Sequence, residues 1–203
     1  MQPEKLPNKT LNKESLLAQL YEGEKKFKQL QKNMLSSFEE LIISANSLNV
    51  FFFNGSEKSE VYGTFTIDEF IIIHKKIITL IEVMIEDENY GYFGLMMFSS
   101  CFNLASYYAM KFDYNKAMEY LQRAADIAIK TDTEYEGFSE YTSLLLKGTP
   151  CNSRFYDNES YSMKMLEQMK HTTFDLIRQT ADFIEIEENL KKYIKEKQMI
   201  KPQ

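Results

Sequence analysis

The chain has 203 residues, of which 44% are hydrophobic and 27% charged, and its formal charge is −6 at pH 7. This composition excludes global disorder, and the acidic balance gives no overall electrostatic reason to bind nucleic acid or an anionic membrane surface. Seven glycines and four prolines argue against a fold built from many turns, such as a β-sandwich or β-barrel. Two cysteines make no disulfide framework and the N-terminus has no signal-peptide pattern, so we expect a cytoplasmic protein.

The N-terminal part is expected to hold a disordered leader, 1–10, followed by a single helical domain, 11–203. Its first section, 11–65, reads as a long amphipathic helix and a loop from Asn49, with loop signals at Asn54-Gly55 and Gly63. Four apolar residues of the helix repeat every seven positions: Leu20, Phe27, Met34 and Leu41. A coiled-coil partner is conceivable, but Gly23 interrupts the second seam, so packing on the rest of the chain is the preferred interpretation.

The middle section, 66–130, is expected to contain three helices. Thr66, followed by Asp68 and Glu69, is typical of a helix start. The stretch 89–110 has no charged residue and is long enough to suggest a membrane span. Its glycines, serines, tyrosines and Asn103 instead favour a helix buried within the protein. The third helix is expected over 114–130.

A repeat-like pattern occupies residues 101–129. Small residues in such a pattern let two antiparallel helices approach closely, while larger ones fill the space between successive pairs. The pattern residues are Leu104, Ala105, Tyr108, Ala117, Leu121 and Ala124. They resemble a tetratricopeptide repeat, although Phe112 stands where that family usually has glycine; an ordinary helical hairpin is the alternative. We therefore expect an all-α fold of antiparallel hairpins stacked as a tetratricopeptide-repeat-like superhelix, with 66–130 as its best repeat-like region and 131–203 as capping helices.

A longer resemblance extends from Thr66 to about Lys192. The segments that carry it are IIHKKIITLIEVMIEDENYGYFG, FNLASYYAMKFDYNKAMEYLQRAADIAIKTDT, EYTSLLLKG and FDLIRQTADFIEIEENLKKY. Their order resembles the C-terminal module of bacterial XRE-family helix-turn-helix transcriptional regulators, which implies a regulatory or assembly module that engages a peptide or another protein chain. The DNA-binding domain of that family is not seen in the first sixty residues, which show no short helix pair with a basic second helix.

Catalytic and metal-binding patterns are not found in the sequence. It has no glycine-rich phosphate loop, nucleophile elbow or metal-ligand spacing, so we expect no enzyme activity, catalytic residue, metal or cofactor. The chemistry-bearing residues His74, His171, Cys101 and Cys151 lack such partners, and a structural role is the default for His74 and Cys101. If the first helix of the repeat lines a concave surface, the residues expected to contact a peptide there are Ser99, Phe102, Asn103 and Ser106.

The leading functional hypothesis is a non-enzymatic protein- or peptide-binding regulatory or oligomerisation module. Its partner would be a protein or peptide, including a second copy of the chain as a homodimer. One alternative is a DNA-binding regulator with a cryptic or truncated N-terminal reader. A further alternative is a structural dimerisation domain that uses the Leu20–Leu41 stripe. Neither direct nucleic-acid binding nor membrane binding is expected from this chain.

Overall fold

The structure is a computed structural model that describes residues 13–53, 66–134, 140–150 and 160–200. Within these ranges it contains helices, turns and an isolated bridge between Glu140 and Pro150, and no β-strand. The α-helices are α1 (Lys13–Phe53), α2 (Ile67–Met84), α3 (Phe93–Met110), α4 (Tyr114–Glu134), α5 (Tyr161–Gln168) and α6 (Ala181–Ile200), with a 3-10 helix η2 (Thr172–Phe174). The expected all-α class is confirmed. The expected leader, 1–10, and the loop signals Asn54-Gly55 and Gly63 lie outside the described residues.

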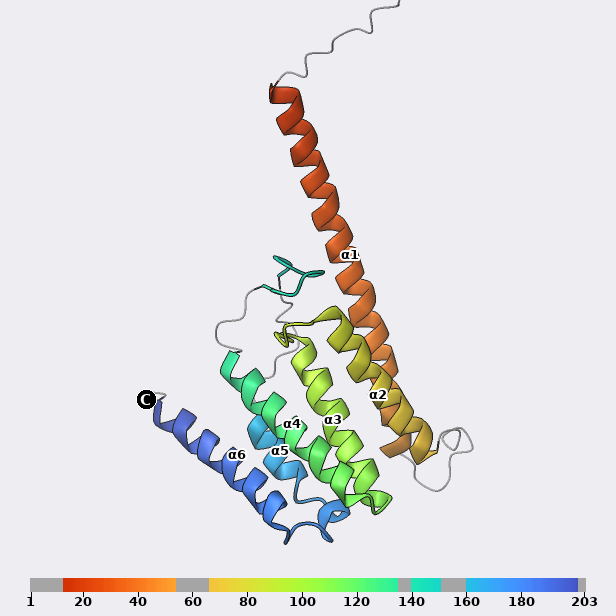
Figure 1. Ribbon diagram of the computed structural model, residues 1–203, viewed down its shortest axis with the longest axis vertical. Helices are drawn as coiled ribbons and strands as arrows, with labels where there is room; N and C mark the ends of the chain where they lie inside the picture. The colour runs from red at the N-terminus through yellow and green to blue at the C-terminus, as the bar shows by residue number, and fades with distance from the viewer. Residues whose placement is uncertain (1–12, 54–65, 135–139, 151–159, 201–203) are drawn as a thin grey trace, which may run out of the picture.

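The helices form a compact body from which half of α1 projects (Figure 1). Helix α3 packs between α2 and α4, and α5, η2 and α6 cover the side of α3 and α4 that faces away from α2. The C-terminal half of α1 lies along α2 and contacts α3, whereas its N-terminal half extends beyond the body. Every functional candidate is therefore placed either within this body or on the projecting helix.

Helix α1 continues further than the sequence predicts. The loop was expected from Asn49, but the structure keeps residues 49–53 helical to Phe53. The strong turn signal, Asn54-Gly55, comes only after this point, and one asparagine followed by valine and phenylalanines lowers helix propensity without ending a helix. The predicted boundary is therefore wrong by several residues.

Helix α2 begins as predicted, at Thr66. The hydroxyl of Thr66 accepts the backbone N–H of Glu69 at 3.3 Å, and the carboxylate of Glu69 accepts the N–H of Thr66 at 2.7 Å. This reciprocal pair is a capping box, which satisfies two N–H groups that the first turn leaves without helical partners. The bond from the Thr66 N–H also lowers the pKa of the Glu69 carboxyl. The ionised carboxylate of Glu69 thus stabilises the first turn of α2.

Helix α3 is buried on almost all sides. Fourteen of its 18 residues are buried, which confirms the expectation for this uncharged stretch. Gly94 allows α4 to come close, since a Cβ atom there would lie 2.6 Å from the hydroxyl oxygen of Thr131. Within the described ranges, no helix has both the length and the apolar character needed to cross a membrane.

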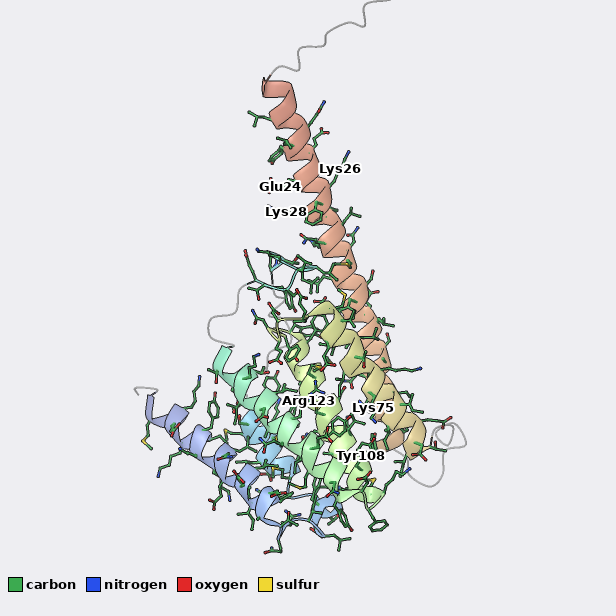
Figure 2. The ribbon with its side chains drawn as sticks, in the orientation of Figure 1. Glu24, Lys26, Lys28, Lys75, Tyr108 and Arg123 are labelled. Carbon is green, nitrogen blue, oxygen red and sulfur yellow. The ribbon has the colours of Figure 1, made fainter. Side chains whose placement is uncertain are left out.

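The hairpin of α3 and α4 carries the residues of the repeat-like pattern. Leu104 and Ala105 on α3 and Ala117, Leu121 and Ala124 on α4 are fully buried, and Tyr108 is nearly so. The Tyr108 ring stacks on Tyr120 with 5.7 Å between centroids, and the ammonium groups of Lys75 and Lys116 lie against the same ring. Figure 2 shows Lys75 reaching from α2 toward Tyr108. Aromatic and cationic contacts therefore join α2, α3 and α4 at the rim of the core.

The C-terminal helices are held to α4 by Asp132. Its carboxylate accepts the backbone N–H groups of Tyr161 and Ser162, at 2.8 and 2.9 Å, and the hydroxyl of Ser160 at 2.5 Å. The backbone carbonyl of Asp132 accepts the ammonium of Lys197 on α6 at 3.2 Å. A carboxylate at the N-terminus of α5 matches the positive end of that helix. One residue thus joins α4, α5 and α6.

Candidate functional site

The residues expected to line a concave peptide surface do not form an open surface. Ser99 and Asn103 are half-buried, while Phe102 and Ser106 are buried. The Phe102 ring packs edge-on against Phe174 of η2, with 5.6 Å between centroids, and the hydroxyl of Ser106 donates to the carbonyl of Phe102 at 3.1 Å. The expectation that Phe102 and Ser106 face a peptide is corrected here, because both side chains are buried and η2 already covers Phe102.

Further aromatic contacts join α3 to the C-terminal helices. The Phe98 ring lies 6.0 Å from that of Tyr161 on α5, and Phe174 in turn lies 6.1 Å from Phe183 on α6. Because apolar side chains from α3, η2 and α6 meet here, this region is part of the core. The residues that fill it come from segments that the sequence analysis treated only as capping helices.

A row of exposed apolar side chains lies on the projecting part of α1. We call residues 17–30 the α1 arm. All described side chains from Gln19 to Leu30 are exposed, and the first buried side chain is Gln31, whose amide donates to the carbonyl of Leu145 at 3.2 Å. Figures 1 and 2 show the arm standing clear of the body. The arm therefore buries none of its described side chains against the described part of the chain.

The apolar residues of the arm lie on nearly the same side of α1 as those of its packed half, since Leu20 and Phe38 are about five helical turns apart. The packed half buries Leu35, Phe38 and Ile42 against α2 and α3. Of the heptad residues, Leu20, Phe27 and Leu41 are exposed and Met34 is half-buried. The preferred expectation that this stripe packs on the rest of the chain is therefore wrong for Leu20, Phe27 and Leu41. Their apolar surface faces solvent.

The arm carries its charges in two blocks. Glu22 and Glu24 precede Lys25, Lys26 and Lys28 along the helix. Glu24 and Lys28 form an ion pair of 2.8 Å, which lowers the pKa of the Glu24 carboxyl and raises that of the Lys28 ammonium. Figure 2 shows Glu24 and Lys28 on one side of the arm and Lys26 on the other. The apolar residues are thus bordered by charged side chains on both sides.

A second exposed apolar element lies where the arm meets the body. Residues 140–150 form a short loop whose Thr142 hydroxyl donates to Asp87 at 2.5 Å and accepts the amide of Asn89 at 2.8 Å. The backbone N–H of Leu144 donates to the carboxylate of Glu86 at 2.5 Å. These bonds hold the loop to the turn after α2 and present the exposed side chains of Leu144 and Leu145. The carboxylates of this turn therefore position a loop.

The reactive groups of the core are neutral and enclosed. Burial lowers the pKa of His74 to about 4 and raises the pKa of the Cys101 thiol to about 12. His74 packs against the ring of Tyr107, 5.9 Å away between centroids. Within the described ranges no three His, Cys, Asp or Glu side chains gather in a way that could hold a metal ion. Cys151 lies outside the described residues.

The remaining residues of the sequence analysis have local structural roles. Asp175 and Arg178 form an ion pair, at 2.8 Å, and Arg178 also donates to the carbonyls of Met169, Lys170 and His171. His171 caps η2, where its ring nitrogen accepts the N–H of Thr173 at 3.3 Å. His171 therefore accepts a backbone hydrogen bond at the start of η2.

Comparison with models of protein families, with curated proteins and with solved structures finds no match for this chain.

Proposed function

We propose that the chain is a non-enzymatic module for association with another polypeptide, and that the apolar side of the α1 arm is its binding surface. One observation carries this proposal. The side chains of Leu20 and Leu30 are each 67% exposed and that of Phe27 is 59% exposed, although the same chain buries a continuous core elsewhere. Exposed apolar side chains that recur along one side of a helix in this way are typical of an interaction site.

Covering the arm would be energetically favourable for two reasons. Burying a leucine or phenylalanine side chain contributes about 1.5–3 kcal/mol, so a partner that covers the arm recovers several such contributions. A helix without tertiary packing is also only marginally stable in water at this length. A second helix laid along the arm would both remove apolar surface from water and stabilise the helical backbone.

We further propose that the helices stack as in tetratricopeptide repeats and that the module has a regulatory role in the cytoplasm. The close crossing of α3 and α4 through Ala105, Ala117 and Ala124 supports a tetratricopeptide-like stacking. The segment order from Thr66 onward supports a regulatory role of the kind found in the C-terminal modules of XRE-family regulators, in the cytoplasm. The DNA-reader alternative receives no support, because residues 13–53 are one continuous helix and not two short ones.

Site-specific photo-cross-linking in cells tests the proposal. A photoreactive amino acid at Phe27 should give a discrete product with one polypeptide, and the second substitution Leu20→Glu should abolish it. Leu176 is the matched control, because its side chain is 70% exposed but lies on the body beyond η2. Equal labelling from both positions, or none from Phe27, would contradict an association surface on the arm.

A further inference from the structure

Resting on this proposed function, we infer that the partner is a second copy of the chain, and that two α1 arms pair antiparallel about a two-fold axis near Lys25. The axis follows from the spacing of the exposed apolar residues. With Lys25 at the centre, residue 20 lies opposite residue 30 of the second copy, and residue 23 lies opposite residue 27. The heptad positions then alternate as an antiparallel coiled coil requires.

The central layers of this pairing are complementary in size. Gly23, which interrupts the seam of a single helix, faces Phe27 of the second copy, and this contact occurs twice because of the symmetry. A Cβ atom at Gly23 would have no heavy atom within 4 Å, so the space beside it is open for such a ring. Leu20 and Leu30 form the flanking layers. The missing side chain of Gly23 therefore leaves room for the Phe27 ring of the second copy.

Charge selects the antiparallel direction. In a parallel pair, the lysine-rich half of each arm, with Lys25, Lys26 and Lys28, would lie beside the same half of the other copy. In the antiparallel pair, each lysine-rich half lies beside the half that contains Glu22 and Glu24. In this register the two Glu24 side chains lie beside each other on one side of the seam, between the Lys28 ammonium groups of the two copies, so that each Glu24 can reach both lysines.

The body contributes a further contact in the same register. Leu17, which lies to one side of the heptad seam and is exposed, would lie level with Asn33 of the second copy and close to its Gln31 on the same side of the pair. Gln31 bonds the carbonyl of Leu145, so Leu17 would rest against the exposed loop residue Leu145. The loop is held by Glu86 and Asp87, and it is therefore a fixed apolar support for the end of the partner's arm.

Sedimentation of the full chain tests self-association. The wild-type chain should sediment as a dimer, and Phe27→Glu should raise the dimer Kd by about 100-fold or more, because two central layers are lost. Leu176→Glu, an exposed substitution away from the arm, should leave the Kd unchanged. Circular dichroism at matched concentration should show that both variants keep the folded body. A monomeric wild-type chain that cross-links to another protein through residue 27 would overturn the second copy as partner but leave the association module intact.

Disulfide formation tests the direction in a Cys151→Ser background, where the remaining Cys101 is buried. A mixture of Leu20→Cys and Leu30→Cys chains should give mixed disulfide dimers, while neither variant alone should cross-link. The reason is that residue 20 of one copy is separated from residue 20 of the other by about 15 Å along the axis. Cross-linking of each variant with itself, and not in the mixture, would show a parallel dimer. That result overturns the antiparallel inference and retains the arm as the interface.

Discussion

At the scale of single residues, Phe112 marks where this hairpin departs from ideal local geometry. It follows α3 with φ of 60°, a left-handed conformation that glycine adopts without steric cost. The N–H of Asp113 bonds the carbonyl of Tyr108 at 2.9 Å, and the N–H of Phe112 bonds that of Ala109 at 3.0 Å. These two bonds form a Schellman motif, whose left-handed position is usually glycine. The side chain of Phe112 is 69% exposed, so little burial offsets the strain.

Phe112→Gly should therefore stabilise the protein by about 1 kcal/mol, because the left-handed backbone no longer strains a Cβ atom. The edge-on contact between Phe112 and Tyr114, 6.3 Å between centroids, is lost and reduces the gain. Urea unfolding at pH 7 measures the difference. Phe112→Ala loses the same ring but keeps the Cβ atom, so it should not be more stable than the wild type; an equal gain from both would contradict the backbone explanation.

At the scale of elements, Asp132 determines how α5 begins. Asp132→Ala removes the acceptor of three hydrogen bonds at the N-terminus of α5 and should destabilise the protein by about 2–3 kcal/mol. Asp126, on the same helix, is exposed and accepts only the amide of Gln122 at 2.8 Å. Asp126→Ala should therefore cost less than about 0.5 kcal/mol. Chemical denaturation of both variants checks this, and similar losses would show that α5 does not depend on its cap.

At the scale of the whole molecule, buried His74 couples folding to pH. Its pKa is lowered from 6.5 to about 4, so the folded state stays neutral while the unfolded chain binds a proton below about pH 6.5. The contribution of His74 to the free energy of unfolding is therefore retained above pH 6.5, the pKa in the unfolded chain. It is lost as the pH falls toward about 4, the pKa in the folded protein. Between pH 7 and pH 5 the loss amounts to about 2 kcal/mol from this group.

The comparison variant for this effect is His74→Phe, which cannot bind a proton and packs a ring of similar shape near Tyr107. Its unfolding free energy should vary less between pH 7 and pH 5 than that of the wild type. Glu39 remains in both proteins, and burial raises the pKa of its carboxyl, so its opposite contribution cancels in the difference. Parallel pH profiles for the two proteins would show that His74 is not responsible.

Sequence reasoning located most of the helices because their local signals are strong. The cap of α2 at Thr66 and the uncharged stretch of α3 are both properties of neighbouring residues, and the structure has them where they were expected. The end of α1 was misplaced because helix propensity changes little from Asn49 to Phe53. The role of Asp132 was missed, since its partners, Tyr161 and Ser162, are thirty residues away in sequence.

The candidate site was harder to predict for the same reason. A helix wheel shows that Phe27 and Phe38 are both apolar, but it does not show that the body ends between them. Phe38 is buried and Phe27 is exposed solely because α2 and α3 reach one and not the other. In the same way, Phe102 looked available for a ligand until Phe174 was found against it.

The sequence by itself determined the helical class, the starts of the helices and the amphipathic pattern of α1, because these depend on spacing and capping within a few residues. The tertiary structure alone decided which apolar faces are buried within the chain and which remain exposed to solvent. That choice depends on contacts between distant segments, which no local pattern encodes. It moved the candidate binding surface from the covered side of α3 to the arm of α1.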